Sequence, residues 1–291
     1  MKRSQIQKTL IGYSFLAPSL ILIFTFVLYP IGWSIYISLC DWPSFGTPTY
    51  IGFENYINLL RDSRWWRSLT HSIYFMANIP LSIILAMLIA IIMNQSLKGI
   101  TIFRTLYYLP VISPSIAVAL VWALIYNTDF GILNYFLSLL GINGPRWLAS
   151  TKWAMPAVIL YSIWKGLGYN MVIYLAGLQG IPETLYEAAK IDGANSWILF
   201  RYITLPMLSP TTFFLMVMGI IGGFRVFDVI YVMTKGGPGD ATVTPLYYLY
   251  QQAFQWFRMG YASSIAWLLF IFVFSATLVQ WYIRKSWVFG E

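Results

Sequence analysis

The sequence predicts an all-α, polytopic membrane protein with six transmembrane helices, and two observations carry this prediction. First, the 291 residues are 59% hydrophobic and 19% aromatic, but only 10% are charged, whereas a soluble domain carries about 25% charged residues. Second, long stretches hold no charge at all, and about 20 apolar residues cross a bilayer as a helix. This composition argues against a soluble enzyme, a disordered chain and a nucleic-acid-binding domain, despite the formal net charge of +8.

Six apolar segments account for the predicted spans. Four lie in charge-free stretches, and the fourth and fifth in chain order carry interior charges. The first is too long for the apolar core of a signal peptide and is expected to remain as an uncleaved helix. The chain is therefore expected to form one transmembrane domain over residues 1–291. We place the spans near residues 10–39, 69–94, 106–126, 153–178, 207–233 and 261–283.

The distribution of Lys and Arg orients these spans. With six spans, both termini lie on one side, which holds nine Lys and Arg residues against seven in longer segments on the other side. The bias is mild, and its strongest element is the N-terminal group of Lys2, Arg3 and Lys8. Because cytoplasmic loops are enriched in basic residues, we expect both termini to be cytoplasmic.

No pattern of residues predicts catalysis or metal binding. Cys40 is the one cysteine and His71 the one histidine, and neither has acidic or cysteine neighbours at metal-ligand spacing. The sequence contains no Gly-x-x-x-x-Gly-Lys-Ser/Thr phosphate loop. We therefore expect a non-catalytic chain that holds no metal and no cofactor of its own.

The loop between the fourth and fifth spans, residues 181–206, is predicted to form two short helices joined by a tight turn. Pro182 suits the first turn of a helix, and Gly193 suits the left-handed residue that ends it. Asn195 or Ser196 can cap the second helix. These features leave two interpretations open: an ordinary connecting loop, or a docking knob that projects from the membrane.

The predicted knob reads Glu187-Ala188-Ala189-x-x-Asp192-Gly193-Ala194, and this pattern resembles the EAA motif of ABC importer permeases. The pattern continues through Phe200, Ile203, Leu205 and Pro206. The resemblance implies that the knob docks into a cleft on a cytoplasmic ATPase, with Glu187 and Gly193 in the coupling site. The residues assigned to ATPase coupling are Glu187, Ala188, Ala189, Asp192, Gly193 and Ala194.

A second motif, Gly236 to Thr242 followed by Tyr250, resembles the outer loop of maltose-type carbohydrate permeases. The likeness runs from about residue 10 to about residue 285 and implies the type I ABC importer permease fold. The chain is similar to the larger permease of that family, without its extra N-terminal spans and large insertion.

The resemblance also implies function, partners and location. The chain would be the non-catalytic permease subunit of a binding-protein-dependent sugar importer in the bacterial inner membrane, where it forms half of the translocation pathway. Its expected partners are a second homologous permease, two ATPase subunits that use ATP and Mg, an extracytoplasmic solute-binding protein, a carbohydrate and the lipid bilayer, and no nucleic acid.

Charges at membrane depth mark a candidate transport pathway. Burying Lys165, Arg225 or Asp228 in lipid costs roughly 2.5–3.5 kcal/mol each, so these groups should face a partner or water. Arg225 and Asp228 are three residues apart and are predicted to share a helix face, where they could pair. Aromatic and amide side chains nearby suit a sugar. The predicted pathway residues are Lys165, Tyr169, Asn170, Gly219, Gly222, Gly223, Phe224, Phe227, Asp228 and Tyr231.

Structural roles for the same residues stay open. The charges can hold spans together, and the glycines can serve helix packing. By resemblance, Tyr169 and the stretch 219–223 correspond to positions that contact sugar in the family, although the glycines themselves depart from its residues there.

Two other functions also stay open. One is a permease for another solute, such as a glycerol phosphate or a polyamine. The other is an autonomous secondary transporter or channel, which would need no ATPase docking surface.

Overall fold

The computed structural model describes residues 2–44, 46–95 and 98–289. Nearly all of its regular structure is helical, and the described strands are the antiparallel pair β1 (Cys40–Asp41) and β2 (Thr49–Tyr50). The chain divides into two compact units, Met1–Asp62 with Leu249–Leu268, and Ser63–Tyr248 with Leu269–Glu291.

The first unit is built around one long helical run. This run consists of α1 (Lys2–Ile23), the π-helical turn η1 (Phe24–Leu28) and α2 (Tyr29–Ser38), and it leads to the strand pair and to α3 (Glu54–Arg61). The Asn55 amide closes the end of α2 by donating to the carbonyls of Ser38, at 3.0 Å, and Cys40, at 2.9 Å. The unit also contains η4 (Gln251–Gln255) and the start of α15 (Met259–Arg284).

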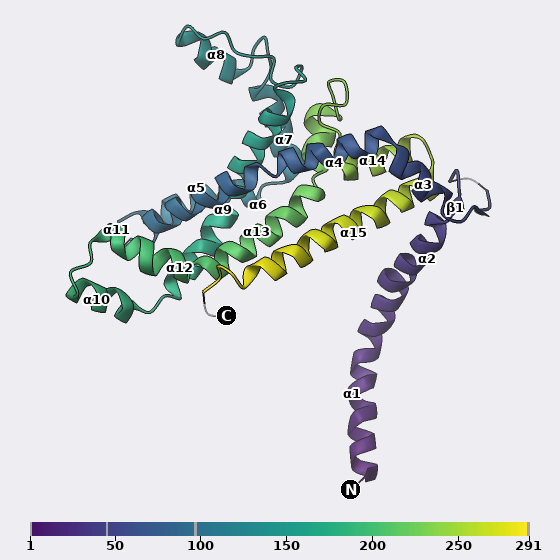
Figure 1. Ribbon diagram of the computed structural model, residues 1–291, viewed down its shortest axis with the longest axis horizontal. Coiled ribbons are helices and arrows are strands. Elements are labelled where there is room, and N and C mark those ends of the chain that lie inside the picture. Colours follow the sequence, from purple (N-terminus) through teal and green to yellow (C-terminus); the bar gives the residue numbers. More distant parts are fainter. Residues whose placement is uncertain (1, 45, 96–97, 290–291) are drawn as a thin grey trace. The chain divides into compact units, whose positions relative to one another are not determined.

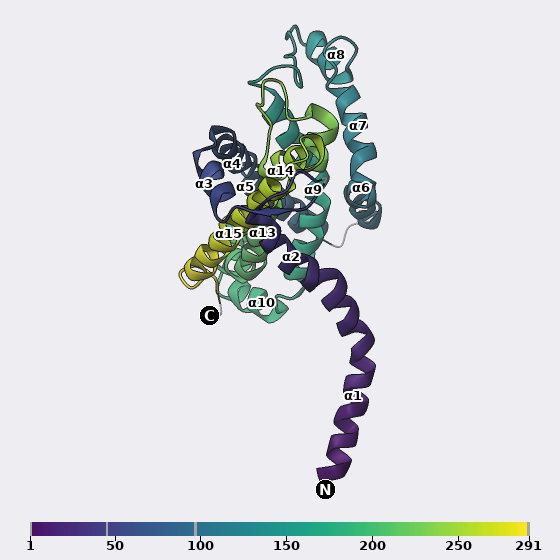
Figure 2. The same ribbon diagram turned by 90° about the vertical axis from the view of Figure 1, so that its right-hand side faces the viewer.

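The second unit holds the remaining helices, and Figures 1 and 2 show α8 and α10 at opposite ends of it. In chain order the unit contains α4 (Ser63–Phe75), α5 (Asn78–Met93), α6 (Ile100–Ile112), α7 (Ser115–Ile125), α8 (Ile132–Leu139), α9 (Ala154–Gln179), α10 (Glu183–Ile191), α11 (Ser196–Leu199), η2 (Phe200–Thr204), α12 (Leu205–Met207), α13 (Ser209–Phe224), η3 (Ile230–Thr234), α14 (Pro245–Tyr250) and the rest of α15.

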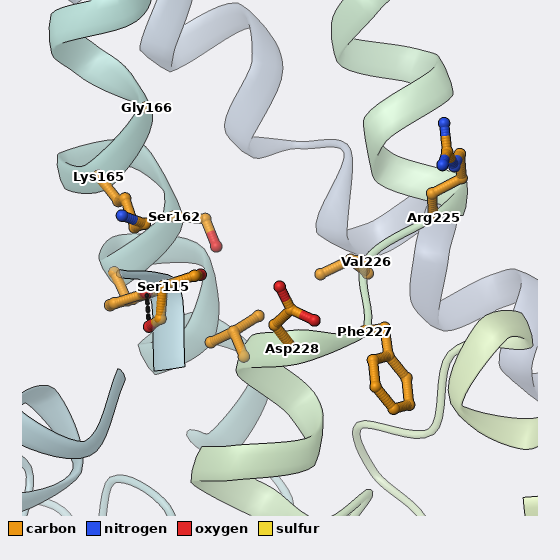
Figure 3. Close-up of a pocket in the computed structure, with 10 residues that line it drawn as sticks. Ser115, Ser162, Lys165, Gly166, Arg225, Val226, Phe227 and Asp228 are labelled. Carbon is orange, nitrogen blue, oxygen red and sulfur yellow. Dashed lines mark hydrogen bonds between the residues drawn. The ribbon is translucent and has the colours of Figure 1, made fainter. Parts of the chain in front are cut away.

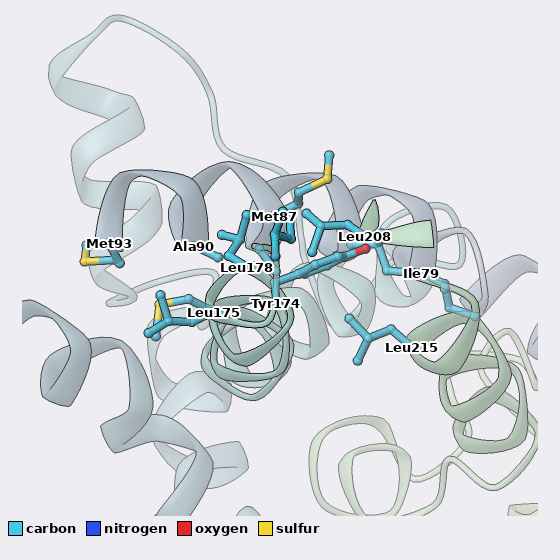
Figure 4. Packing of buried hydrophobic residues seen from close by; sticks show 13 residues of the cluster. Ile79, Met87, Ala90, Met93, Tyr174, Leu175, Leu178, Leu208 and Leu215 are labelled. Atoms are coloured by element: carbon cyan, nitrogen blue, oxygen red, sulfur yellow. The ribbon is translucent and has the colours of Figure 1, made fainter. Parts of the chain in front are cut away.

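The core of this unit lies where α9 packs along α5, with α13 beside them (Figure 4). Ala86 and Ala90 on α5 are fully buried, because small side chains let helix backbones approach closely. Tyr174 is also fully buried, and its hydroxyl is hydrogen-bonded to the Thr212 hydroxyl at 2.9 Å. This hydrogen-bonded pair of hydroxyls holds α9 against α13. The 181–206 loop connects these two helices.

Three of the described helical segments are long and apolar enough to cross a membrane: Ile11–Ser38, Ser63–Met93 and Met259–Arg284. Two bent helix pairs, α6 with α7 and the 196–207 segment with α13, raise the number to five if each pair is one span. The helix α9 is not among them, because Lys165, Tyr169 and Asn170 make its middle less apolar. By length and composition, three to five of the described segments can span a membrane, and the predicted number of six is not confirmed.

Two of the predicted spans are broken. The third is bent by 98° between α6 and α7, at Pro114, which has no backbone N–H to continue a helix. The fifth ends at Phe224, and residues 225–227 are not helical. The prediction that Arg225 and Asp228 share a helix face is therefore wrong, since no continuous helix joins them.

Candidate coupling loop and transport cavity

The first helix of the 181–206 loop ends in a Schellman motif. Gly193 has a φ of +83°, the left-handed conformation that its sequence position predicts. Its N–H donates to the Lys190 carbonyl at 3.1 Å, and the Ala194 N–H donates to the Ala189 carbonyl at 2.9 Å. Both bonds satisfy carbonyls that the end of α10 would otherwise leave open. The chain therefore turns sharply at this point.

The second part of the loop is anchored to the core of the unit. Asn195 caps α11 by accepting a hydrogen bond from the Ile198 N–H at 2.9 Å, which decides between the two predicted caps. The hydroxyls of Tyr186 and Thr204 are 3.0 Å apart and join α10 to η2. The half-buried side chains that pack against the core are Tyr186, Phe200, Ile203 and Leu205.

The opposite side of the loop is open. Glu187, Ala188, Asp192 and Gly193 are exposed, and Ala189 and Ala194 are half-buried. Large apolar side chains lie among them, with exposed fractions of 86% for Ile191 and 68% for Trp197. Exposed apolar groups that gather on one surface mark a site of interaction. The loop thus exposes both polar and apolar side chains.

A cavity of about 320 Å³ lies between α9, the start of α7 and the break after α13 (Figure 3). Three of the predicted pathway residues, Lys165, Phe227 and Asp228, line it. The other lining residues are Ser115, Tyr161, Ser162, Gly166, Arg225, Val226 and Val229. Tyr161 and Ser162 precede Lys165 by one helical turn, so the i, i+4 and i, i+3 spacing could have predicted them.

Lys165 forms hydrogen bonds to the backbone at the bend between α6 and α7. Its ammonium group donates to the carbonyl oxygens of Pro110, at 2.8 Å, and Ser113, at 3.0 Å. In an unbroken helix the Pro110 carbonyl would accept from residue 114, but Pro114 has no N–H. The lysine supplies the missing donor from a different helix. This contact gives Lys165 a structural role at the edge of the cavity.

Arg225 and Asp228 do not pair. Within the described part of the chain the structure records no ion pair between them, and both side chains are exposed. Figure 3 shows the guanidinium group of Arg225 directed away from Asp228. The Asp228 carboxylate therefore remains free to accept hydrogen bonds in the cavity that it lines.

The remaining predicted pathway residues lie outside this cavity. A Cβ added at Gly219 would lie 3.0 Å from the Ile79 side chain, and one at Gly223 would lie 2.6 Å from Met76, whereas Gly222 faces open space. The close approach of neighbouring side chains thus explains why glycine occupies positions 219 and 223.

The polar and aromatic members also have their own contacts. Asn170 donates to the Ser82 hydroxyl at 2.9 Å, Phe224 is buried, and Tyr169 is 38% exposed. Tyr231 stacks on Phe227 with ring centroids 5.5 Å apart.

The Gly236–Thr242 loop is held in one conformation. Gly236 has a φ of +80°, and a Cβ there would lie 2.7 Å from the Tyr247 ring, so only glycine fits. Arg64 on α4 forms an ion pair with Asp240 at 2.8 Å. The Thr242 hydroxyl donates to the Gly237 carbonyl at 2.9 Å. The loop therefore presents a fixed surface rather than a flexible link.

The described residues contain no group of three or more His, Cys, Asp or Glu side chains that could hold a metal ion.

Residues 65–287 match the family described as binding-protein-dependent transport system inner membrane component. The chain belongs to this family of ABC transporter permeases. It is 40% identical to the probable ABC transporter permease protein YesP of Bacillus subtilis (strain 168), over 100% of this chain and 96% of that protein. It is 35% identical to the trehalose/maltose transport system permease protein MalF of Thermococcus litoralis, over 92% of each. The lactose transport system permease protein LacF of Rhizobium radiobacter is 34% identical, over 94% of each.

Solved structures of ABC transporters share the fold of this permease. A bacterial ABC transporter involved in the import of the acidic polysaccharide alginate matches with a TM-score of 0.85, over 99% of each chain at 23% identity. The same TM-score holds for the alginate transporter in complex with an alginate pentasaccharide-bound periplasmic protein, over 97% of this chain and 96% of that one. The type I importer permease fold of this chain is thereby shown.

Proposed function

We propose that the chain is the transmembrane permease subunit of a binding-protein-dependent, ATP-driven sugar importer and forms half of its translocation pathway. The observation that carries this proposal is the exposed 181–206 loop in a member of the permease family. The named sugars of the relatives, trehalose/maltose and lactose, support a carbohydrate solute.

Coupling would run through the exposed loop. Glu187 offers a charge, Ala188 and Ala189 allow close approach, and Ile191 offers an apolar contact to a cleft on an ATPase subunit. Two such ATPases, which bind ATP and Mg, would move this loop and that of a second homologous permease together. The complex would then alternate between outward- and inward-open states, each favoured by a different nucleotide state.

In this proposal the chain is one permease domain with six spans and cytoplasmic termini. The span beyond the five candidates is α9, the fourth in chain order, whose 26 residues extend about 39 Å and exceed the hydrocarbon thickness of about 30 Å. Its interior charge, Lys165, is already hydrogen-bonded to two carbonyls. Such bonding is what allows ionisable groups inside a membrane.

The cavity beside Lys165 would take part of the sugar. Asp228 can accept hydrogen bonds from sugar hydroxyls, and Ser115, Tyr161 and Ser162 can donate or accept them. The stacked Phe227 and Tyr231 rings offer apolar faces for the C–H surface of a sugar ring. The solute-binding protein would deliver the sugar from outside, where the fixed Gly236–Thr242 loop is a candidate docking surface.

Two observations weigh against the alternatives. Lys165 and Asp228 place opposite charges on the same cavity, which suits a neutral polyhydroxylated solute better than a glycerol phosphate or a polyamine. An autonomous secondary transporter has no use for an exposed coupling loop.

The coupling assignment is tested by Glu187→Ala and Gly193→Asp in the complete transport complex. We expect each change to lower ATP-dependent uptake and co-purification of the ATPase by about tenfold or more, as for central interface residues. Glu183→Ala is the matched control, because Glu183 is exposed on the same helix one turn earlier. Wild-type uptake and ATPase association in both coupling variants would refute the assignment.

A further inference from the structure

The residues after α15 fold back onto the start of α13. The Phe289 N–H donates to the Ser209 hydroxyl at 2.8 Å. The Trp287 ring lies 6.1 Å from the Phe213 ring, and Val288 between them is only 8% exposed. We call Trp287–Phe289 the C-terminal strap. Figure 1 shows the end of α15 next to α12.

Ser209 sits at the bend between α12 and α13. The segment 196–207 and α13 are inclined by 56°, and Ser209 is the first residue of α13. Its hydroxyl donates to the Pro206 carbonyl at 2.6 Å and accepts from the Phe289 N–H. Only 6% of Ser209 is exposed. One buried hydroxyl therefore joins both sides of the bend to the strap.

Aromatic contacts hold the last turn of α15 against the same helix. The Phe213 ring lies 6.3 Å from the Trp281 ring, so Trp281 and Trp287 both contact it. The Arg284 guanidinium lies 4.0 Å from the centroid of the Trp281 ring and 5.9 Å from that of Phe213. Such cation–π contacts fix a long side chain in place. Side chains of α15 thus hold α13 in place next to the bend.

The coupling loop is also hydrogen-bonded close to this bend. The hydroxyls of Tyr186 on α10 and Thr204 at the end of η2 are hydrogen-bonded. Thr204 precedes Ser209 by five residues, and Leu208 between them is fully buried. A continuous set of contacts therefore runs from α10 through the bend to the strap and α15.

We propose that the C-terminal strap is a positioning element for coupling. It fixes the bend at Ser209, so that a displacement of α10 moves α13 and α15 as one body instead of flexing the bend. Trp287 and Ser209 are its positioning residues. This inference rests on the proposed coupling role of the loop, but the strap itself touches neither the ATPase surface nor the cavity.

The test uses Trp287→Ala and Ser209→Ala in the complete transport complex. Three quantities are measured: ATPase co-purification, solute imported per ATP hydrolysed, and hydrogen exchange of the full chain over residues 204–212. We expect co-purification of the ATPase to stay unchanged and the solute imported per ATP to fall about threefold or more. Hydrogen exchange over residues 204–212 should become about fivefold faster, as for one lost hydrogen bond. Ser286→Ala is the control, because the Ser286 hydroxyl is exposed and donates to the Ile283 carbonyl at the end of α15.

The outcomes separate the strap from the coupling loop. Normal import per ATP in both strap variants overturns the inference, as does an equal loss in Ser286→Ala. Loss of ATPase co-purification in Trp287→Ala also overturns it, since the strap would then serve assembly. If the wild-type chain binds no ATPase, the proposed function fails, and no coupling role for the strap survives. Exchange over residues 204–212 then still decides whether the strap fixes the bend.

Discussion

At the scale of single residues, Lys165 shows how a charge can be required inside an apolar unit. Pro114 leaves the Pro110 carbonyl without its helical donor, and Lys165 donates to that carbonyl and to Ser113. Because these hydrogen bonds replace the helical donor that Pro114 lacks, the lysine stabilises the bend between α6 and α7.

Lys165→Met should therefore destabilise the protein by about 1.5–3 kcal/mol, the range for a hydrogen bond to a charged group. Thermal unfolding of the purified chain in detergent or nanodiscs measures this. Lys152→Met is the control, because Lys152 lies in an exposed loop. An unchanged unfolding temperature for Lys165→Met would mean that the bend does not depend on the lysine.

At the scale of elements, the contact of α6 with α9 depends on one glycine. A Cβ at Gly168 would clash with the Tyr107 carbonyl oxygen, whereas one at Gly166 on the same helix meets nothing within 4 Å. The Tyr107 backbone cannot move aside as a side chain can.

Gly168→Ala should thus destabilise the fold by about 1–3 kcal/mol, as overpacking does, and Gly166→Ala should not. Denaturation of the two variants side by side measures the difference. Equal stability of the two would show that α6 and α9 are not in close contact.

Individual helices and turns show which features of the structure could be predicted from the sequence. Local chemistry fixes the turn at Gly193, which was predicted correctly, whereas the sequence left the cap of α11 open between Asn195 and Ser196 and the structure selects Asn195. The break after Phe224 was missed, since the apolar pattern of that span continues past it. The partner of Lys165 was missed because Pro110 is 55 residues away, and no pattern in one helix reveals a contact with another.

At the scale of the whole molecule, few charged residues are present, and the charges in the two candidate sites are correspondingly easy to assign. Lys165 and Asp228 line the cavity, and Glu187 and Asp192 lie exposed on the coupling loop. The fold, shared with known importers at a TM-score of 0.85, carries both features on one compact unit. In the proposed function, the two features together would let the subunit convert contact with an ATPase into movement of a solute pathway.

The most direct test of this account is a cross-link from the coupling loop to the ATPase. Cys40 is fully buried, so Cys40→Ala gives a cysteine-free background in which Ile191→Cys is the one reactive thiol. A short thiol-reactive photo-cross-linker at residue 191 should capture the ATPase subunit in native membranes, and Lys152→Cys should not. Absence of a cross-link at residue 191, or equal capture from residue 152, would contradict the account.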